Sequence, residues 1–194
     1  MSETIKADIR QHFVASAEVM ARTGEMYADQ IFEVAVRVAG SLRAGGKVMT
    51  CGNGGSASDA EHIATEFVSR YRRERQPLPA MALTGCSATL TAIGNDYGFE
   101  QLFARQVTAH GSPGDVLFAI STSGASPNVL AAVRTAKLAG LVTVGFTGAR
   151  AGGLEESAEV VFAVPSAVTA HIQQCHITIA HAICEAVDEI LAGV

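Results

Sequence analysis

Residues 47–56 read Lys-Val-Met-Thr-Cys-Gly-Asn-Gly-Gly-Ser. An apolar run typical of a buried strand leads here into a loop with three glycines, and a helical pattern follows. Further apolar runs come at residues 80–83, 116–120, 142–146 and 160–164, each separated from the next by helical patterns. Strands rich in Val, Leu and Ile that alternate with helices predict βαβ units and a parallel sheet covered on both faces. We therefore expect an α/β fold with a doubly wound, five-stranded parallel sheet.

Helical patterns occupy most of the remaining chain. After the first strand they cover residues 57–71, 89–95, 99–110, 127–138 and 170–191. Before it, residues 4–42 carry apolar side chains at helical spacing on two different faces, which predicts two helices that end at Gly45-Gly46. No repeat, low-complexity tract or Pro/Ser-rich linker divides the sequence. We expect one domain over residues 1–194, with N-terminal helices at 1–44 and an α/β core at 45–194.

Charged residues are scarce in this chain. Lys and Arg number 14 against 19 Asp and Glu, which gives a net charge of −5, and charged residues make up 17%, against about 25% in typical soluble domains. Much of the surface must then be small or apolar, which predicts buried contacts between subunits. The one basic run, residues 70–75, is too short for a nucleic-acid footprint. Charged residues also interrupt every long apolar run, so we expect neither a nucleic-acid nor a membrane partner.

The start of the sequence and its cysteines bear on the compartment. The first residues lack the apolar segment of a secretory signal, so we expect a cytoplasmic protein. The four cysteines (Cys51, Cys86, Cys175 and Cys184) show no CxxC spacing, which indicates reduced, small hydrophobic residues rather than a disulfide framework.

Two loops that follow strands have the composition of anion-binding sites, and ligands of doubly wound sheets bind beyond the carboxyl ends of strands. The loop at 52–58 matches neither GxGxxG nor Walker A, so it does not support dinucleotide or nucleoside triphosphate binding. Its glycines suit an ordinary turn as well as an anion at a helix N-terminus. The loop at 121–126, Ser-Thr-Ser-Gly-Ala-Ser, places four hydroxyls before a helix. Ordinary capping needs a single hydroxyl, so we favour an anion site there.

Two pairs of polar residues could bind a metal ion. His62 and Glu66 are four residues apart and therefore share one helix face. Gln173 and His181 are eight apart in an apolar helical stretch, about 80° around the helix. His/Glu pairs also occur on ordinary exposed faces, and a histidine in an apolar stretch is often a hydrogen-bonded core residue. The residues alone leave both interpretations open.

These motifs resemble a known family. Gly52-Asn53-Gly54-Gly55-Ser56 after one strand and the 121–126 loop after another are similar to the loops of the sugar isomerase (SIS) domain, a flavodoxin-like fold that binds phosphosugars. Within it the whole chain, including Gly94-Asn95-Asp96-Tyr97-Gly98, resembles the phosphoheptose isomerases. The resemblance implies an aldose–ketose isomerase that converts sedoheptulose 7-phosphate to D-glycero-D-manno-heptose 7-phosphate through an enediolate. It further implies bacterial heptose biosynthesis of the ADP-heptose and lipopolysaccharide type, and a homotetramer with active sites between subunits.

The resemblance also assigns roles to residues. It implies one Zn²⁺ per subunit held by His62, Glu66, Gln173 and His181, a set that by residue type also suits Mn²⁺, Fe²⁺ or Ni²⁺. Glu66 is the implied base and His181 the implied acid, and we leave His176 and Cys184 outside the set. The implied contacts to a phosphorylated seven-carbon sugar are Asn53, Gly54, Gly55, Ser56, Glu66, Arg70, Asn95, Asp96, Ser121, Thr122, Ser123, Ser126 and Gln173. Arg70 equally suits a solvated basic face.

Some positions depart from the family pattern, and they keep alternatives open. Residues 165–172 lack the usual aspartate, Gln174 stands where an acid is common, and Cys86 stands where an aspartate is frequent. The alternatives are an isomerase of another phosphosugar, a sugar-phosphate sensor, or a non-catalytic SIS protein of the kind that associates with the replication initiator DnaA. Relatives of that last kind lack the terminal histidine that His181 supplies here, which favours the isomerase.

Overall fold

A five-stranded parallel sheet forms the centre of the molecule, in a computed structural model that describes residues 2–150 and 152–193. Its strands are β1 (Val48–Gly52), β2 (Ala80–Ala82), β3 (Val116–Ile120), β4 (Val142–Gly148) and β5 (Val160–Val164). Their order across the sheet is β2-β1-β3-β4-β5, and every neighbouring pair is parallel. This is the flavodoxin-like doubly wound order, so the fold expected from the sequence is confirmed.

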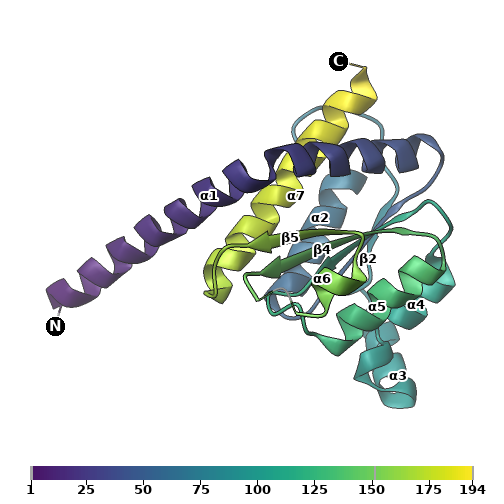
Figure 1. Ribbon diagram of the computed structural model, residues 1–194. Coiled ribbons are helices and arrows are strands. Elements are labelled where there is room, and N and C mark those ends of the chain that lie inside the picture. Colours follow the sequence, from purple (N-terminus) through teal and green to yellow (C-terminus); the bar gives the residue numbers. More distant parts are fainter. Residues whose placement is uncertain (1, 151, 194) are drawn as a thin grey trace.

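Helices cover both faces of the sheet (Figure 1). One face carries α1 (Ser2–Arg43), α2 (Gly55–Val68) and α7 (Thr169–Ala192). The other carries α4 (Ala104–His110), α5 (Pro127–Leu138) and α6 (Leu154–Ser157), with α3 (Ser87–Tyr97) projecting beyond them. A 3₁₀ turn, η1 (Phe99–Gln101), separates α3 from α4, so the single helix expected over 99–110 is wrong. The chain turns there because Leu102 and Phe103 are buried in the core on that face.

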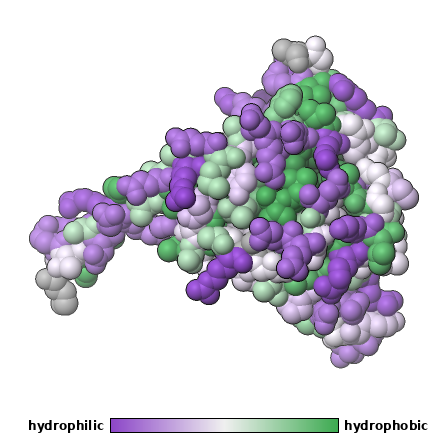
Figure 2. All heavy atoms as spheres, in the orientation of Figure 1, coloured by the Kyte–Doolittle hydropathy of each residue, from purple (hydrophilic) through white to green (hydrophobic). Residues whose placement is uncertain are grey.

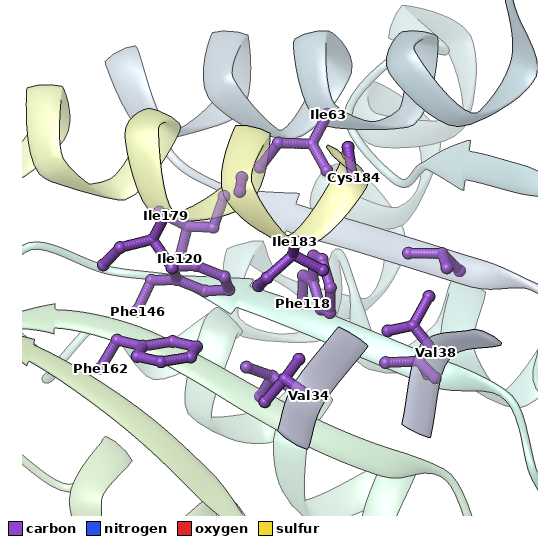
Figure 3. Close-up of a cluster of buried hydrophobic side chains, with 14 of the residues drawn as sticks. Val34, Val38, Ile63, Phe118, Ile120, Phe146, Phe162, Ile179, Ile183 and Cys184 are labelled. Atoms are coloured by element: carbon purple, nitrogen blue, oxygen red, sulfur yellow. The ribbon is translucent and has the colours of Figure 1, made fainter. Parts of the chain in front are cut away.

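The alternation of side chains along the strands divides the core in two. On β3, Phe118 and Ile120 face α1, α2 and α7, whereas Leu117 and Ala119 face α4 and α5. Figure 3 shows the first of these cores, where Ile63 and Ile183 of two helices meet the strand side chains. Full burial of each such side chain contributes about 1.5–3 kcal/mol to folding. The sheet therefore holds both helical layers.

The N-terminal region is one continuous helix, so the expectation of two helices is wrong. No proline interrupts residues 2–43, and Gly24 in a helix interior costs only about 1 kcal/mol. The hydroxyl of Thr23 donates to the carbonyl oxygen of Val19 at 2.7 Å, within the helical turn. The second half of α1 packs on the sheet through residues such as Val34 and Val38.

The start of α1, residues 2–14, extends beyond the body as an arm (Figure 1), and the helix meets α7 where His12 lies beside His171 and Ser16 bonds to Gln174. Ile5, Ile9 and Phe13 on this arm are 54%, 54% and 71% exposed. Figure 2 shows hydrophobic side chains among hydrophilic ones on its visible face. Along the part of the chain that the structure describes, we find no helix with both the length and the apolar character that crossing a membrane requires.

The basic run at 70–75 pairs with acidic residues. Arg72 and Arg73 contact Glu185 and Glu189 of α7 on the surface. Arg75 differs, because its Nε lies 2.6 Å from Asp188 Oδ1 and both side chains are nearly buried. The Arg75 guanidinium also donates to the carbonyl oxygens of Glu66 and Phe67, each at 2.8 Å. It therefore holds the C-terminal end of α2 against α7.

We predict that Arg75→Ala lowers the free energy of unfolding by about 3–5 kcal/mol, because it leaves the Asp188 carboxylate buried without a counter-ion. Arg72→Ala, which breaks the exposed pair with Glu185, should cost less than about 1 kcal/mol. Urea denaturation at equal protein concentration measures both variants. Equal losses in the two would contradict a special role for Arg75.

Candidate functional site

Neighbouring strands bring the two glycine- and serine-rich loops together. β1 and β3 pair from Val48 with Val116 to Gly52 with Ile120, so their carboxyl ends lie level. The chain leaves these strands in opposite directions across the sheet, towards β2 from β1 and towards β4 from β3. Such a topological switch point opens a crevice at the carboxyl edge of the sheet. The sequence therefore places both candidate anion loops at the standard ligand position of this fold.

The serine loop, residues 121–126, presents its hydroxyls as a cluster. Ser121 Oγ lies 2.9 Å from Ser126 Oγ and 3.4 Å from Ser123 Oγ. Ser126 precedes α5 and makes no side-chain hydrogen bond to the helix, and Pro127 occupies the first turn. No hydroxyl caps the N-terminus of α5, although the Val129 N–H donates to Asn128 Oδ1. The positive end of a helix dipole attracts an anion. The loop has the donors of a phosphate site without any lysine.

The glycine loop, residues 52–55, begins α2 without a side-chain cap as well. Gly54 precedes the helix with φ of 58°, a value that favours glycine. A Cβ on Gly52 would lie within 3 Å of Ser56, so the loop needs glycine there too. Neither Ser56 nor Ser58 caps α2, because both residues lie inside the helix, which begins at Gly55. Ser56 is instead buried under the loop.

Three candidate metal ligands meet between α2 and α7. His62 Nε2 lies 2.9 Å from Glu66 Oε1 and 3.4 Å from His181 Nε2. One ligand atom from each residue lies within 4.8 Å of the other two. Two imidazoles and a carboxylate form the donor set of catalytic zinc sites that keep an open position. The residues present fit a divalent ion, which matches the helix spacing expected from the sequence.

Tyr71 and His62 hold the ring of His181 between them. The Tyr71 ring stacks on it with centroids 5.0 Å apart, and the His62 ring meets it edge-on at 5.0 Å. Burial lowers the pKa of His181, the neighbouring His62 lowers it further, and Glu66 acts in the opposite direction. A neutral imidazole at neutral pH can bind a metal ion or accept a proton. Sequence reasoning missed Tyr71, because the helix expected over 57–71 ends at Val68 and the chain beyond it brings Tyr71 to His181.

Gln173 lies two turns before His181 on α7 and packs against the first residue of α2. A Cβ on Gly55 would collide with the Gln173 side-chain amide. Gly55 therefore provides the space that lets Gln173 sit beside the start of α2, on the same helix pair as the His62, Glu66 and His181 cluster. The family resemblance implies a substrate-binding role for Gly55, and the structure adds this steric one.

Arg70, Asn95 and Asp96 are not brought to the three-ligand cluster by contacts within the described part of the chain. Arg70 is exposed and pairs with Glu74 at 3.4 Å. Asn95 and Asp96 bond to each other at 2.8 Å on α3, a helix with no buried residue. α3 packs chiefly on η1 rather than on α2 or α7. Their substrate roles remain predictions.

The residues left outside the ligand set lie in the core. His176 is fully buried, with Nε2 3.0 Å from the carbonyl oxygen of Thr147. Burial lowers its pKa to about 4. Cys184 is buried too, and burial raises its pKa to about 12. All four cysteines are free, as expected from their spacing, but Cys86 differs from the other three because it is exposed at the start of α3, and hydrogen bonds with Thr89 lower its pKa.

Comparison with known proteins agrees with this geometry. The sequence pattern described as "SIS domain" matches residues 11–148. A phosphoheptose isomerase of Roseiflexus sp. (strain RS-1) is 55% identical over 177 residues, which cover 91% of this chain and 90% of that protein. The chain belongs to the phosphoheptose isomerase family. The resemblance stated from the sequence is thereby confirmed.

Solved structures of the phosphoheptose isomerase family share the whole fold. The phosphoheptose isomerase from Neisseria gonorrhoeae superimposes with a TM-score of 0.90 at 37% identity, covering 95% of this chain and 99% of that one. The one from Francisella tularensis gives 0.91 at 38% identity, covering 94% and 97%. The likeness includes the N-terminal helix as well as the sheet.

We predict that Gly55→Ala weakens Zn²⁺ binding about tenfold or more, because the new methyl group displaces Gln173. Gly24→Ala in α1 is the matched control, since a Cβ there meets nothing within 4 Å. Competition with a zinc chelator measures both affinities. An unchanged affinity in Gly55→Ala would remove Gln173 from the ligand set.

His176 makes the stability of the fold depend on pH. Its pKa of about 4 in the folded chain lies below the ordinary 6.5, so the unfolded chain binds more protons between these values. The contribution of neutral His176 to the free energy of unfolding is complete above about pH 6.5, and it falls by about 1.4 kcal/mol per pH unit as the pH drops towards 4. We predict that His176→Asn flattens this decline in urea denaturation, whereas His110→Asn on the surface leaves it unchanged. If the free energy of unfolding declines equally with falling pH in the wild-type protein and in His176→Asn, the prediction is contradicted.

Proposed function

We propose that this chain catalyses the aldose–ketose isomerisation of sedoheptulose 7-phosphate to D-glycero-D-manno-heptose 7-phosphate. The observation that carries the proposal is the cluster of His62, Glu66 and His181 beside two loops that can hold an anion. Every relative named above is a phosphoheptose isomerase. Carbon-acid chemistry of this kind needs a base, an acid and stabilisation of an enediolate.

The serine loop is the proposed site of the phosphate group. Ser121, Ser123 and Ser126 supply hydroxyls, Thr122 a further one, and the N-terminus of α5 supplies the positive end of its helix dipole. Neutral donors of this type hold a phosphate without the fixed cation that phosphoryl-transfer enzymes bring to it. The chain's net charge of −5 is therefore no obstacle to an anionic substrate. The sugar chain would run from this loop towards the glycine loop.

Two side chains are proposed to move protons. After ring opening, the Glu66 carboxylate removes the proton from C1, and the electrons of that C–H bond form the C1–C2 double bond of the enediolate. His181, whose pKa is lowered by burial, moves a proton from the oxygen on C1 to the oxygen on C2. Return of the carbon-bound proton at C2 then leaves the carbonyl group on C1. The family resemblance implies these two roles, and the position of both residues in one cluster supports them.

A divalent metal ion, proposed as Zn²⁺ with one ion per subunit, belongs to this site. His62, Glu66 and His181 would hold it, with Gln173 as the fourth ligand from the same helix pair. When bound, the ion polarises the substrate oxygens. Imidazole and carboxylate ligands also suit Fe²⁺, Mn²⁺ or Ni²⁺, so metal analysis of the purified protein tests its identity.

The assembly is proposed to be a homotetramer in the cytoplasm, with active sites between subunits. Ile5, Ile9 and Phe13 on the arm of α1 are more than half exposed in a single chain, and contacts with other copies would bury them. α3 likewise has no buried residue, yet it carries Asn95 and Asp96. In the assembly these two residues would bind hydroxyls in the site of a neighbouring copy, as would Arg70. The product would serve bacterial heptose biosynthesis of the ADP-heptose type.

We predict that Glu66→Gln and His181→Ala each lower kcat at least about a hundredfold, because each removes a group that transfers a proton. Glu155→Gln and His110→Ala, exposed residues outside the site, are the matched controls and should keep wild-type rates. NMR of sedoheptulose 7-phosphate with zinc-loaded protein follows the appearance of the heptose 7-phosphate.

Two outcomes of that assay would reject the proposal. Absence of turnover by the wild-type protein with zinc would exclude the isomerase. Unchanged rates in both site variants would instead favour a binding protein that shares the SIS fold.

A further inference from the structure

A reciprocal pair of amides joins the two loops of the site. Asn53 Nδ2 donates to Asn128 Oδ1, and Asn128 Nδ2 donates to Asn53 Oδ1, each at 2.8 Å. Asn53 belongs to the glycine loop and is half-buried, whereas Asn128 lies in the first turn of α5 and is 1% exposed. The two residues are 75 apart in sequence. They meet because β1 and β3 are neighbours in the sheet.

A third hydrogen bond fixes the direction of this pair. Two facing amides could both turn over and still bond to each other. Asn128 Oδ1, however, also accepts from the backbone N–H of Val129 at 3.0 Å. Turning Asn128 over would point its NH₂ group at that N–H, two donors face to face. Asn128 is therefore locked in one orientation, and it imposes the matching orientation on Asn53.

The fixed orientation of the Asn53–Asn128 pair determines which hydrogen bonds Asn53 can make with a ligand. Its side-chain amide has two N–H donors and two acceptor lone pairs. The pair uses one N–H and one lone pair, which leaves one donor and one acceptor in fixed positions. Sugar hydroxyls both donate and accept, so a fixed donor and acceptor pair suits one hydroxyl geometry. We propose that Asn128 is a positioning residue, which orients the Asn53 amide for the sugar and holds the glycine loop against the phosphate loop.

This inference rests on the proposed function, and it adds a residue that the sequence motifs did not single out. Asn128 itself is buried and touches Asn53 rather than the open face of the loop. It stands one residue after Pro127 in the helix whose N-terminus is the proposed phosphate site. A shift of Asn53 relative to α5 would change the separation between the sugar and phosphate contacts. Uniform loss of such contacts raises KM and leaves kcat unchanged.

Two variants test the hydrogen bonds that Asn128 makes with Asn53 and Val129. Asn128→Asp keeps the shape and still accepts from Asn53 and Val129, but the ionised carboxylate has no proton to donate to Asn53 Oδ1. Asn128→Leu keeps a similar volume and removes all three hydrogen bonds. We expect KM for sedoheptulose 7-phosphate to rise about fivefold to tenfold in each at pH 8, with kcat within about threefold of wild type.

Gln106→Leu is the matched control for loss of a buried amide. Gln106 is 7% exposed, and its side chain donates to the carbonyl oxygens of Leu83 and Leu102. Its replacement should lower the midpoint of thermal unfolding and leave KM unchanged. If the Asn128 variants behave in the same way, with a lower midpoint and a KM within about twofold of wild type, Asn128 is only structural and the inference is overturned.

A second measurement does not depend on turnover. The side-chain NH₂ signals of Asn53, assigned by their loss in Asn53→Asp, are recorded by NMR in the ligand-free protein. Their two protons should have separate, slowly exchanging signals in the wild-type protein and in Gln106→Leu, and should shift towards solvent-exposed values in Asn128→Leu. Unchanged signals in Asn128→Leu would overturn the inference. Absence of turnover in the wild-type protein would instead refute the proposed function, and the NMR result then decides the inference alone.

Discussion

The parallel pairing of β1 with β3 is the constraint on which the rest of the site depends. It brings the carboxyl ends of two strands level, although more than sixty residues separate them in the chain. The glycine loop leaves one strand and the serine loop leaves the other, so the Asn53 and Asn128 amides can bond directly. Without this register, each loop would be an isolated turn before a helix. The two candidate anion loops and the Asn53–Asn128 amide pair are consequences of one sheet topology.

The second constraint is the contact between α2 and α7, which determines where the candidate metal ligands lie. α2 starts directly after the glycine loop, so the position of the loop fixes the position of His62 and Glu66 two to three turns later. α7 meets it with Gln173 against Gly55 and His181 against His62. Near the C-terminal end of α2, Arg75 donates to Asp188 of α7 and to the carbonyl oxygen of Glu66. Each end of α2 therefore has its own contact with α7.

The sequence predicts the parts of this arrangement that depend on local pattern. Apolar runs located all five strands, because buried parallel strands are continuously hydrophobic. The spacing of His62 and Glu66 placed them on one face, because helix geometry is regular. The break expected in α1 was wrong, since tertiary packing and the absence of proline let the helix continue through Gly24. Tyr71 and Asn128 were missed because their partners are distant in sequence, and no local pattern encodes such contacts.

The exposed surfaces of the single chain argue that its site is incomplete on its own. A helix with no buried residue, such as α3, gains little from the hydrophobic effect in an isolated chain, yet it carries two of the expected substrate contacts. Ile5, Ile9 and Phe13 of the α1 arm are likewise more than half exposed in the single chain. The low charged fraction, 17%, is consistent with surfaces that meet other copies. If the same contacts between copies cover the α1 arm and bring Asn95 and Asp96 to the site of a neighbouring copy, assembly and completion of the site occur together. A chain that failed to assemble would then keep its metal ligands and its phosphate loop but lose its contacts to the sugar hydroxyls.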